Sequence, residues 1–88
     1  MVQKELLQAL GTRIRELRTK RGYSQEAFAD HCGVHRTFMG TVERGESNLS
    51  FTNLARIAAA LEITMSRLLS GLEQKVGKSR SGAPAEGK

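Results

Sequence analysis

Residues 24–45 constrain the fold of this chain more than any other stretch, because a single glycine separates two short segments with helical periodicity. Apolar residues before Gly33 lie one helical turn apart, and those after it recur at spacings of three and four residues, the period of an α-helix. Ser24 is a good N-cap for the first segment. Gly33 suits the turn, because glycine adopts a positive φ without steric cost. The stretch therefore predicts two short helices joined by a tight turn, with the second ending at Gly45.

Helical periodicity continues before this pair. Residues 1–23 predict one helix with an apolar stripe at Leu6, Leu10, Ile14 and Leu17. Gly11 interrupts the stripe and costs about 1 kcal/mol relative to alanine. Residues 1–9 are therefore expected either to fray or to pack against a partner subunit.

Two further helices are expected after the polar loop at residues 46–49. Ser50 caps a fourth helix, and Thr64 caps a short fifth helix. The buried stripe of the fourth helix is predicted to contain Phe51, Leu54, Ile57, Ala58 and Leu61. From residue 73 onward the chain is rich in glycine and serine and has almost nothing to bury, which is typical of disorder. The expected architecture is all-α, with a five-helix domain at residues 1–72 and a disordered basic tail at residues 73–88.

The charge of the chain suggests a polyanionic partner. The net charge is +5 and the isoelectric point is about 10.0. Residues 13–21 alone contain five basic side chains and one acidic side chain, which form either a solvated helix face or a surface beside phosphates. The chain has one cysteine, no apolar run of the roughly 20 residues that span a bilayer, and no signal-peptide pattern. We therefore expect a cytoplasmic protein without a membrane partner.

The sequence contains no pattern of an enzyme or of a metal site. It has no glycine-rich phosphate loop, no acid pair and no Ser–His–Asp set, and a chain of 88 residues has little interior for a substrate pocket. His31, Cys32 and His35 offer three donors, but a structural zinc site takes four ligands in two separated pairs. We expect no catalytic residue, no metal, no cofactor and no small-molecule ligand.

Two short helices with a glycine turn form a helix-turn-helix, whose second helix enters the major groove of double-stranded DNA. Three segments in this order, RGYSQEAFA, VERG and LARIAAAL, make residues 13–63 resemble the Xre/Cro family of phage-repressor-like DNA-binding domains. The resemblance implies a lambda-repressor-like fold with the helix-turn-helix at helices 2 and 3. Within the family, the run HRTFMGTVERGESNLS is most similar to the small controller proteins of restriction–modification systems. The chain departs from the family pattern at His35, where serine or threonine is common, and at Gly40, a poor helix former.

The second helix of the motif carries the candidate base contacts. Side chains in the first turn of such a helix reach base edges, so Arg36 and Thr37 are predicted to contact bases. Arginine hydrogen-bonds guanine in a bidentate manner, although Arg36 could instead touch only a phosphate. Thr41 lies one turn further along the same face, and Gly40 lets the backbone approach DNA closely.

Four other polar residues are candidate phosphate ligands: Gln25, Arg44, Ser47 and Asn48. The family resemblance implies that Gln25 clamps a phosphate beside the N-terminus of its helix. The other three follow the recognition helix, although Arg44 is also suited to stabilise the helix dipole. The resemblance further implies that Arg18 and Glu43 form a structural ion pair, which links the first helix to the recognition helix.

A DNA-binding domain this small gains affinity by dimerising, so we expect a homodimer on an inverted-repeat operator. The expected dimer surface is the last helix, although its leucines are equally suited to close the monomer core. This surface consists of Met65, Leu68, Leu69 and Leu72. The alternative function, from another class, is an antitoxin or adaptor module whose main partner is a protein.

Overall fold

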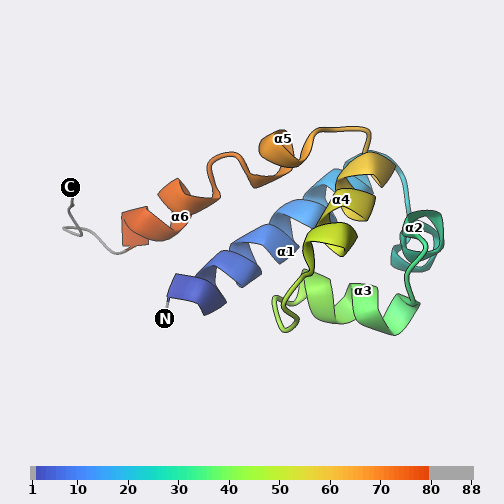
Figure 1. Cartoon of the computed structure of the whole chain (residues 1–88), viewed down its shortest axis with the longest axis horizontal. Coiled ribbons are helices and arrows are strands. Elements are labelled where there is room, and N and C mark those ends of the chain that lie inside the picture. The colour runs from blue at the N-terminus through green and yellow to red at the C-terminus, as the bar shows by residue number, and fades with distance from the viewer. Residues whose placement is uncertain (1, 80–88) are drawn as a thin grey trace.

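The computed structural model describes residues 2–79, which form six helices and no strand (Figure 1). In chain order they are α1 (Val2–Lys20), α2 (Gln25–Cys32), α3 (Arg36–Glu43), α4 (Phe51–Ala60), α5 (Met65–Leu69) and α6 (Leu72–Ser79). The predicted all-α class is confirmed, and so is the helix-turn-helix at α2 and α3. None of the described helices is long and apolar enough to cross a membrane.

Four of the helices begin at a side-chain cap. Ser24, Ser50 and Thr64 each accept a hydrogen bond, through the hydroxyl oxygen, from a backbone N–H three residues later. His35 caps α3 with its ring, because Nδ1 accepts from a backbone N–H two residues later at 3.1 Å. The unusual residue at position 35 therefore leaves α3 capped. Gly33 has a φ of 77° and makes the turn that ends α2.

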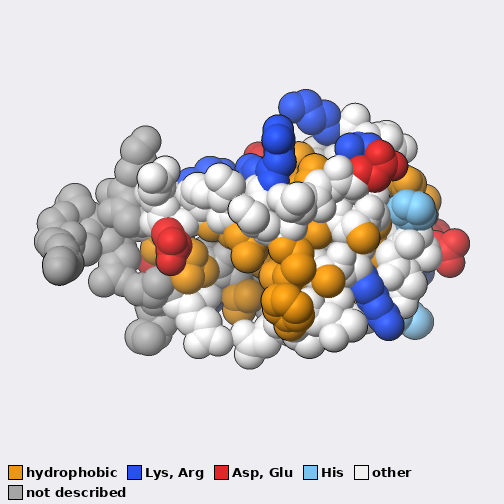
Figure 2. All heavy atoms as spheres, turned by 45° about the horizontal axis from the view of Figure 1, so that its top comes forward, with side chains coloured by type: hydrophobic (Ala, Val, Ile, Leu, Met, Phe, Trp, Pro, Cys, Tyr) orange, Lys and Arg blue, Asp and Glu red, His pale blue; other side chains and the backbone are white. Residues whose placement is uncertain are grey.

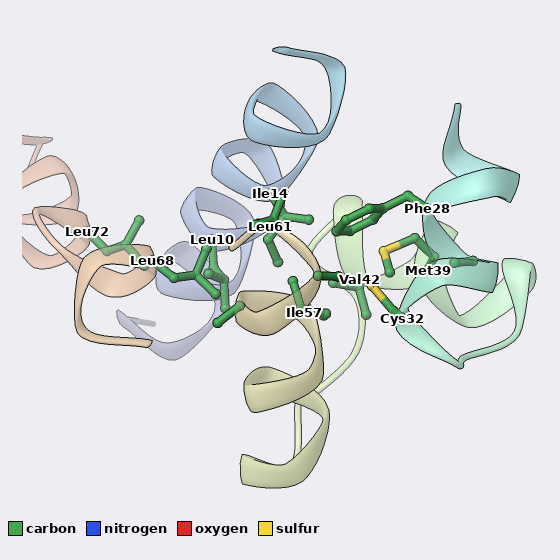
Figure 3. Packing of buried hydrophobic residues seen from close by; sticks show 13 residues of the cluster. Leu10, Ile14, Phe28, Cys32, Met39, Val42, Ile57, Leu61, Leu68 and Leu72 are labelled. Carbon is green, nitrogen blue, oxygen red and sulfur yellow. The ribbon is translucent and has the colours of Figure 1, made fainter. Parts of the chain in front are cut away.

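One hydrophobic core joins all six described helices, and Figure 3 shows side chains from these helices converging on it. Each large side chain that is fully buried stabilises the fold by about 1.5–3 kcal/mol. Met39 and Val42 belong to this core and anchor the inner face of α3. The opposite face of α3 is therefore left at the surface. The largest fully buried side chains are Ile14, Phe28, Met39, Ile57, Leu61 and Leu68.

The two ends of the described chain differ from the sequence-based expectation. Residues 2–9 are helical and continuous with the rest of α1, and residues 72–79 form α6 instead of the start of a disordered tail. α6 packs against α1 (Figure 1). Leu72 and Val76, one turn apart on α6, are buried. Each segment thus covers apolar surface of the other, which corrects both the expected fraying and the domain boundary at residue 72. The remaining tail, residues 80–88, lies outside the described residues.

Gly11 lies where α1 touches the C-terminal end of α3. A Cβ at this position would lie 2.5 Å from the carbonyl oxygens of both Val42 and Glu43. No real Cβ makes so close a contact with backbone, so only glycine lets the two helices approach to this distance. The residue that weakens α1 as a helix is therefore the residue that permits its packing on α3.

Replacing Gly11 with alanine is expected to lower the free energy of unfolding by about 1–3 kcal/mol, because the added methyl group must push α1 away from α3. Helix propensity alone predicts the opposite sign, since alanine stabilises a helix interior by about 1 kcal/mol relative to glycine. Urea denaturation measures the difference. Thr12→Ala, on the exposed side of α1, is the control and should stay within about 0.5 kcal/mol of the wild type. A Gly11→Ala variant as stable as the wild type would contradict the close contact.

Candidate nucleic-acid interface

The first turn of α3 presents two exposed polar side chains. Arg36 and Thr37 are both exposed, while Met39 and Val42 are buried on the opposite side of the same helix. The hydroxyl of Thr37 has no hydrogen-bond partner within residues 2–79. α3 therefore holds two of the four predicted base-contacting residues on its outer face, in the turn where a recognition helix reads bases.

A buried ion pair holds the other end of α3. Arg18 donates to Glu43 twice, from Nε to Oε2 at 2.6 Å and from Nη2 to Oε1 at 3.0 Å, and the two side chains are 11% and 4% exposed. Arg18 also donates from Nη1 to the carbonyl oxygen of Tyr23 at 2.9 Å. Gln25 donates from Nε2 to Oε1 of Glu43 at 3.1 Å. The structural ion pair expected from the family pattern is confirmed, and it ties α1, α2 and α3 together at one carboxylate.

The amide of Gln25 is thus partly engaged before any DNA binds. Its Nε2 carries two N–H groups, and the bond to Glu43 uses one of them. The second N–H remains for the predicted phosphate contact. The contact with Glu43 also sets where that N–H lies relative to α3.

Gly40 lies beneath two of the predicted phosphate ligands. A Cβ at Gly40 would lie 3.2 Å from Nη1 of Arg44 and 3.6 Å from Oε1 of Gln25, and the glycine is buried. A Cβ here would need a small shift of the Arg44 guanidinium, whereas its contact with Gln25 would be an ordinary van der Waals contact. Because Gly40 is buried beneath Arg44, its predicted contact with a base requires Arg44 to move aside.

The hydroxyl groups of Thr41 and Ser47 bond to each other. Ser47 donates from Oγ to Oγ1 of Thr41 at 2.5 Å, and Thr41 in turn donates from Oγ1 to the carbonyl oxygen of Phe38 at 2.7 Å. These bonds hold the loop after α3 against the helix. Both hydroxyl groups already donate hydrogen bonds within the protein. Their contacts with DNA therefore stay predictions, which would require these bonds to rearrange.

Exposed carboxylates accompany both arginines of this surface, which the sequence reasoning missed. Nη1 of Arg36 lies 3.3 Å from Oε1 of Glu26, and Nε of Arg44 lies 3.1 Å from Oε1 of Glu46. All four side chains are more than half exposed, so each pair contributes little to stability. The Arg36–Glu26 pair joins residues ten positions apart across the turn, and no local spacing rule predicts it. Asn48 is exposed and accepts from Nε2 of Gln3 at 3.0 Å.

Basic residues of α1 and of the turn that follows it contact other parts of the fold. Arg13 donates from Nε to the carbonyl oxygen of Leu68 at 2.8 Å and from Nη2 to that of Arg67 at 3.0 Å, at the end of α5. Arg21 pairs with Glu62, in the turn between α4 and α5, at 3.6 Å. With Arg18 engaged at α3, three of the five basic residues in this run have structural partners. This run is therefore weak evidence for a phosphate-binding surface.

The predicted dimer surface needs correction. Leu68 is 0% exposed and Leu72 is 6% exposed, so both close the core of the monomer and leave almost no surface for a partner. Met65 is half-buried against the same core, and Leu69 is 39% exposed. Phe51, predicted to be buried in the stripe of α4, is instead 76% exposed. Residue periodicity alone could not show that the core extends along α4 only as far as Leu54 and does not reach Phe51.

An open apolar groove of about 650 Å³ lies beside these exposed residues. Leu54 and Leu69 line it from α4 and α5, and Leu6 and Leu7 line it from α1. Phe51 stands one helical turn from Leu54, on the same side of α4. Figure 2 shows hydrophobic side chains gathered across the middle of one face of the molecule. Leu69 and Phe51 are therefore neighbours of an apolar surface that a monomer leaves exposed.

Cys32 and the two histidines are separated by their environments. Cys32 is buried, and burial raises the pKa of its thiol to about 11, so the thiol stays protonated at neutral pH. His31 stacks on Tyr23, with ring centroids 5.3 Å apart, and His35 caps α3. Within residues 2–79, no three His, Cys, Asp or Glu side chains form a group that could hold a metal ion.

The helix-turn-helix family model matches residues 14–68, and the chain belongs to this family, in its Xre-type branch of DNA-binding transcription regulators. These regulators are not enzymes. The predicted family is therefore confirmed, and with it the prediction of a DNA-binding regulator.

Several relatives are controllers of restriction–modification systems. Control protein C.MunI of a Mycoplasma species is 39% identical over 66 residues, covering 74% of this chain and 89% of the relative. The crystal structure of the restriction–modification controller protein C.AhdI from Aeromonas hydrophila has a TM-score of 0.68 and 46% identity, covering 72% of this chain and 94% of that chain. The biofilm master regulator SinR, crystallised in complex with DNA, has a TM-score of 0.66 and 31% identity, covering 69% of this chain and 98% of that chain.

Proposed function

We propose that this regulator is a cytoplasmic, controller-like protein that binds an inverted-repeat operator as a homodimer. The observation that carries the proposal is the outward placement of Arg36 and Thr37 on a recognition helix whose inner face is buried and whose C-terminal end is held by Glu43. A side chain on so firmly placed a helix can discriminate between bases, because its register relative to the groove is set by the fold. The controller relatives C.MunI and C.AhdI support this role.

Arg36 is the proposed base reader. An arginine at the start of a recognition helix donates two hydrogen bonds to O6 and N7 of guanine, which discriminates against other bases by about 1–3 kcal/mol. Thr37 offers a hydroxyl to a base edge or a methyl group to thymine. Gly40 and Thr41, deeper along α3, would contact DNA only after Arg44 and Ser47 rearrange.

The proposed phosphate ligands lie at the start of α2 and in the segment that follows α3. Gln25 has one amide N–H left over from its bond to Glu43, and Arg44 has a guanidinium that is more than half exposed. Asn48 is exposed in the following loop, and Ser47 lies beside it. Contacts of this kind set the position of the protein on the duplex without reading its sequence.

We place the dimer surface at Phe51, Leu69 and the apolar groove beside them, together with Met65, which lies one helical turn from Leu69 on α5. A projecting aromatic ring next to an apolar groove is self-complementary, so two copies related by a two-fold axis can fill each other's groove. A two-fold dimer would then present two copies of α3 to half-sites about one helical turn apart.

Selection of bound DNA from a random library, at near-physiological salt, tests the operator. The wild type should enrich an inverted repeat with a guanine at equivalent positions of both half-sites, and Arg36→Ala should lose at least about tenfold in affinity for it. Arg15→Ala removes the same charge from the exposed side of α1 and should retain the site. Enrichment of no site, or of the same site by Arg36→Ala, would contradict the proposal.

Leu69→Glu tests the dimer surface, because Leu69 is exposed in the monomer and a charge there should leave the fold intact. Sedimentation velocity should show a dimer for the wild type and a monomer for Leu69→Glu, and operator affinity should fall by more than about tenfold. Thr12→Glu adds the same charge on the exposed side of α1 and should remain dimeric. A wild type that is monomeric while it fills both half-sites, or a Leu69→Glu variant that still dimerises, would refute the surface.

A further inference from the structure

Glu26 lies beside the proposed base reader in the free protein. Its carboxylate contacts Nη1 of Arg36 at 3.3 Å, across the turn between α2 and α3. Asp30, one turn further along α2, and His35 line the same depression of the surface. The guanidinium that would read a base thus lies next to one carboxylate, with a second in the same depression, on the face that would meet the negatively charged DNA.

We propose that Glu26 is a specificity-determining residue, which weakens binding of Arg36 to phosphates of any sequence while leaving its contact with the cognate guanine intact. The inference rests on the proposed role of Arg36 as a base reader. It assigns Glu26 a positioning role, because the carboxylate acts through the guanidinium of Arg36 and not by its own contact with a base.

The chemistry of the two targets explains the difference. A phosphate carries a full negative charge, so a carboxylate 3.3 Å from the guanidinium opposes the attraction between Arg36 and any phosphate. The O6 and N7 edge of guanine is a pair of neutral acceptors, so the nearby carboxylate costs this contact much less. Non-specific binding depends almost entirely on phosphate contacts. Glu26 therefore lowers the affinity for non-specific DNA more than the affinity for the specific site.

The geometry of the pair leaves Arg36 free to read guanine. The guanidinium has five N–H donors in a planar fork, and the contact with Glu26 is made at Nη1. The edge formed by Nε and Nη2 remains for a bidentate contact with a base. An exposed ion pair changes an equilibrium constant by only a few-fold, whereas a bidentate contact with guanine discriminates by about fivefold to 150-fold. The ion pair is therefore too weak to prevent the contact of Arg36 with its cognate guanine. It is strong enough to weaken binding of Arg36 at sites that lack this guanine.

Glu26→Gln removes the charge and keeps the size of the side chain. We would titrate the selected operator and a scrambled duplex of the same composition with each variant, by fluorescence anisotropy over a series of salt concentrations. Glu26→Gln should bind the scrambled duplex about threefold to tenfold more tightly and the operator within about twofold of the wild type. The ratio of the two affinities falls accordingly. The salt dependence on the scrambled duplex should steepen by about one counterion.

Two carboxylates of the same chain provide matched controls. Glu46→Gln frees Arg44, a proposed phosphate ligand on both duplexes, so it should raise both affinities equally and leave their ratio unchanged. Glu16→Gln changes the same charge on the exposed side of α1 and should change both affinities by less than about twofold. Only Glu26→Gln is expected to change the ratio.

The Arg36→Ala background shows whether Glu26 acts through Arg36. Glu26→Gln should have no effect on the ratio in that background, because the guanidinium that it positions is gone. Equal changes on both duplexes in the wild-type background, or an effect that persists in Arg36→Ala, would overturn the inference alone. If the wild type selects no operator, the proposed function fails and this inference fails with it.

Discussion

The recognition surface depends on the ion pair between Arg18 and Glu43. Glu43 is the last residue of α3, and its buried carboxylate accepts from Arg18 of α1 and Gln25 of α2. A buried pair of this kind contributes less to stability than its short distances suggest, because both charges lose their hydration. Its larger effect is on orientation, since two parallel hydrogen bonds from the planar guanidinium fix the placement of the carboxylate. The C-terminal end of α3 is thereby held at a single point shared by three helices.

The backbone contact at Gly11 acts on the same end of α3. With no Cβ, α1 lies directly against the carbonyl oxygens of Val42 and Glu43, beside the ion pair. The inner face of α3 is anchored by Met39 and Val42 in the core, and its first turn is capped by His35. Every constraint on α3 thus comes from one side or from its ends. The outer face, with Arg36 and Thr37, is left for a partner, and the partner of this family is DNA.

The sequence was sufficient for the elements that depend on local rules. Helical periodicity, Ser24 and Gly33 predicted α2 and α3, and the family pattern implied the pair of Arg18 and Glu43. α6 was missed because two apolar residues in a glycine-containing segment become a buried face only when the first turns of α1 lie opposite them.

Contacts between residues far apart in the sequence also determine which candidate site residues are exposed. Periodicity assigns both Phe51 and Leu68 to the apolar face of a helix. Phe51 is exposed and Leu68 is buried, because burial depends on which helix lies opposite. The contact of Glu26 with Arg36 depends on the angle of the turn. Residues 24–45 therefore predicted where DNA contacts would lie, while the three-dimensional arrangement showed which side chains were already engaged by the fold.

Methylation protection of the selected operator tests most directly the claim that Arg36 of each subunit reads a guanine. Dimethyl sulfate attacks N7 of guanine in the major groove, which is the atom that a bidentate arginine covers. Two protected guanines are expected, one in each half-site, at symmetric positions about one helical turn apart. Arg36→Ala, at a concentration that still occupies the DNA, should lose this protection. Guanines that react equally with and without protein, or protection that survives in Arg36→Ala, would contradict this claim.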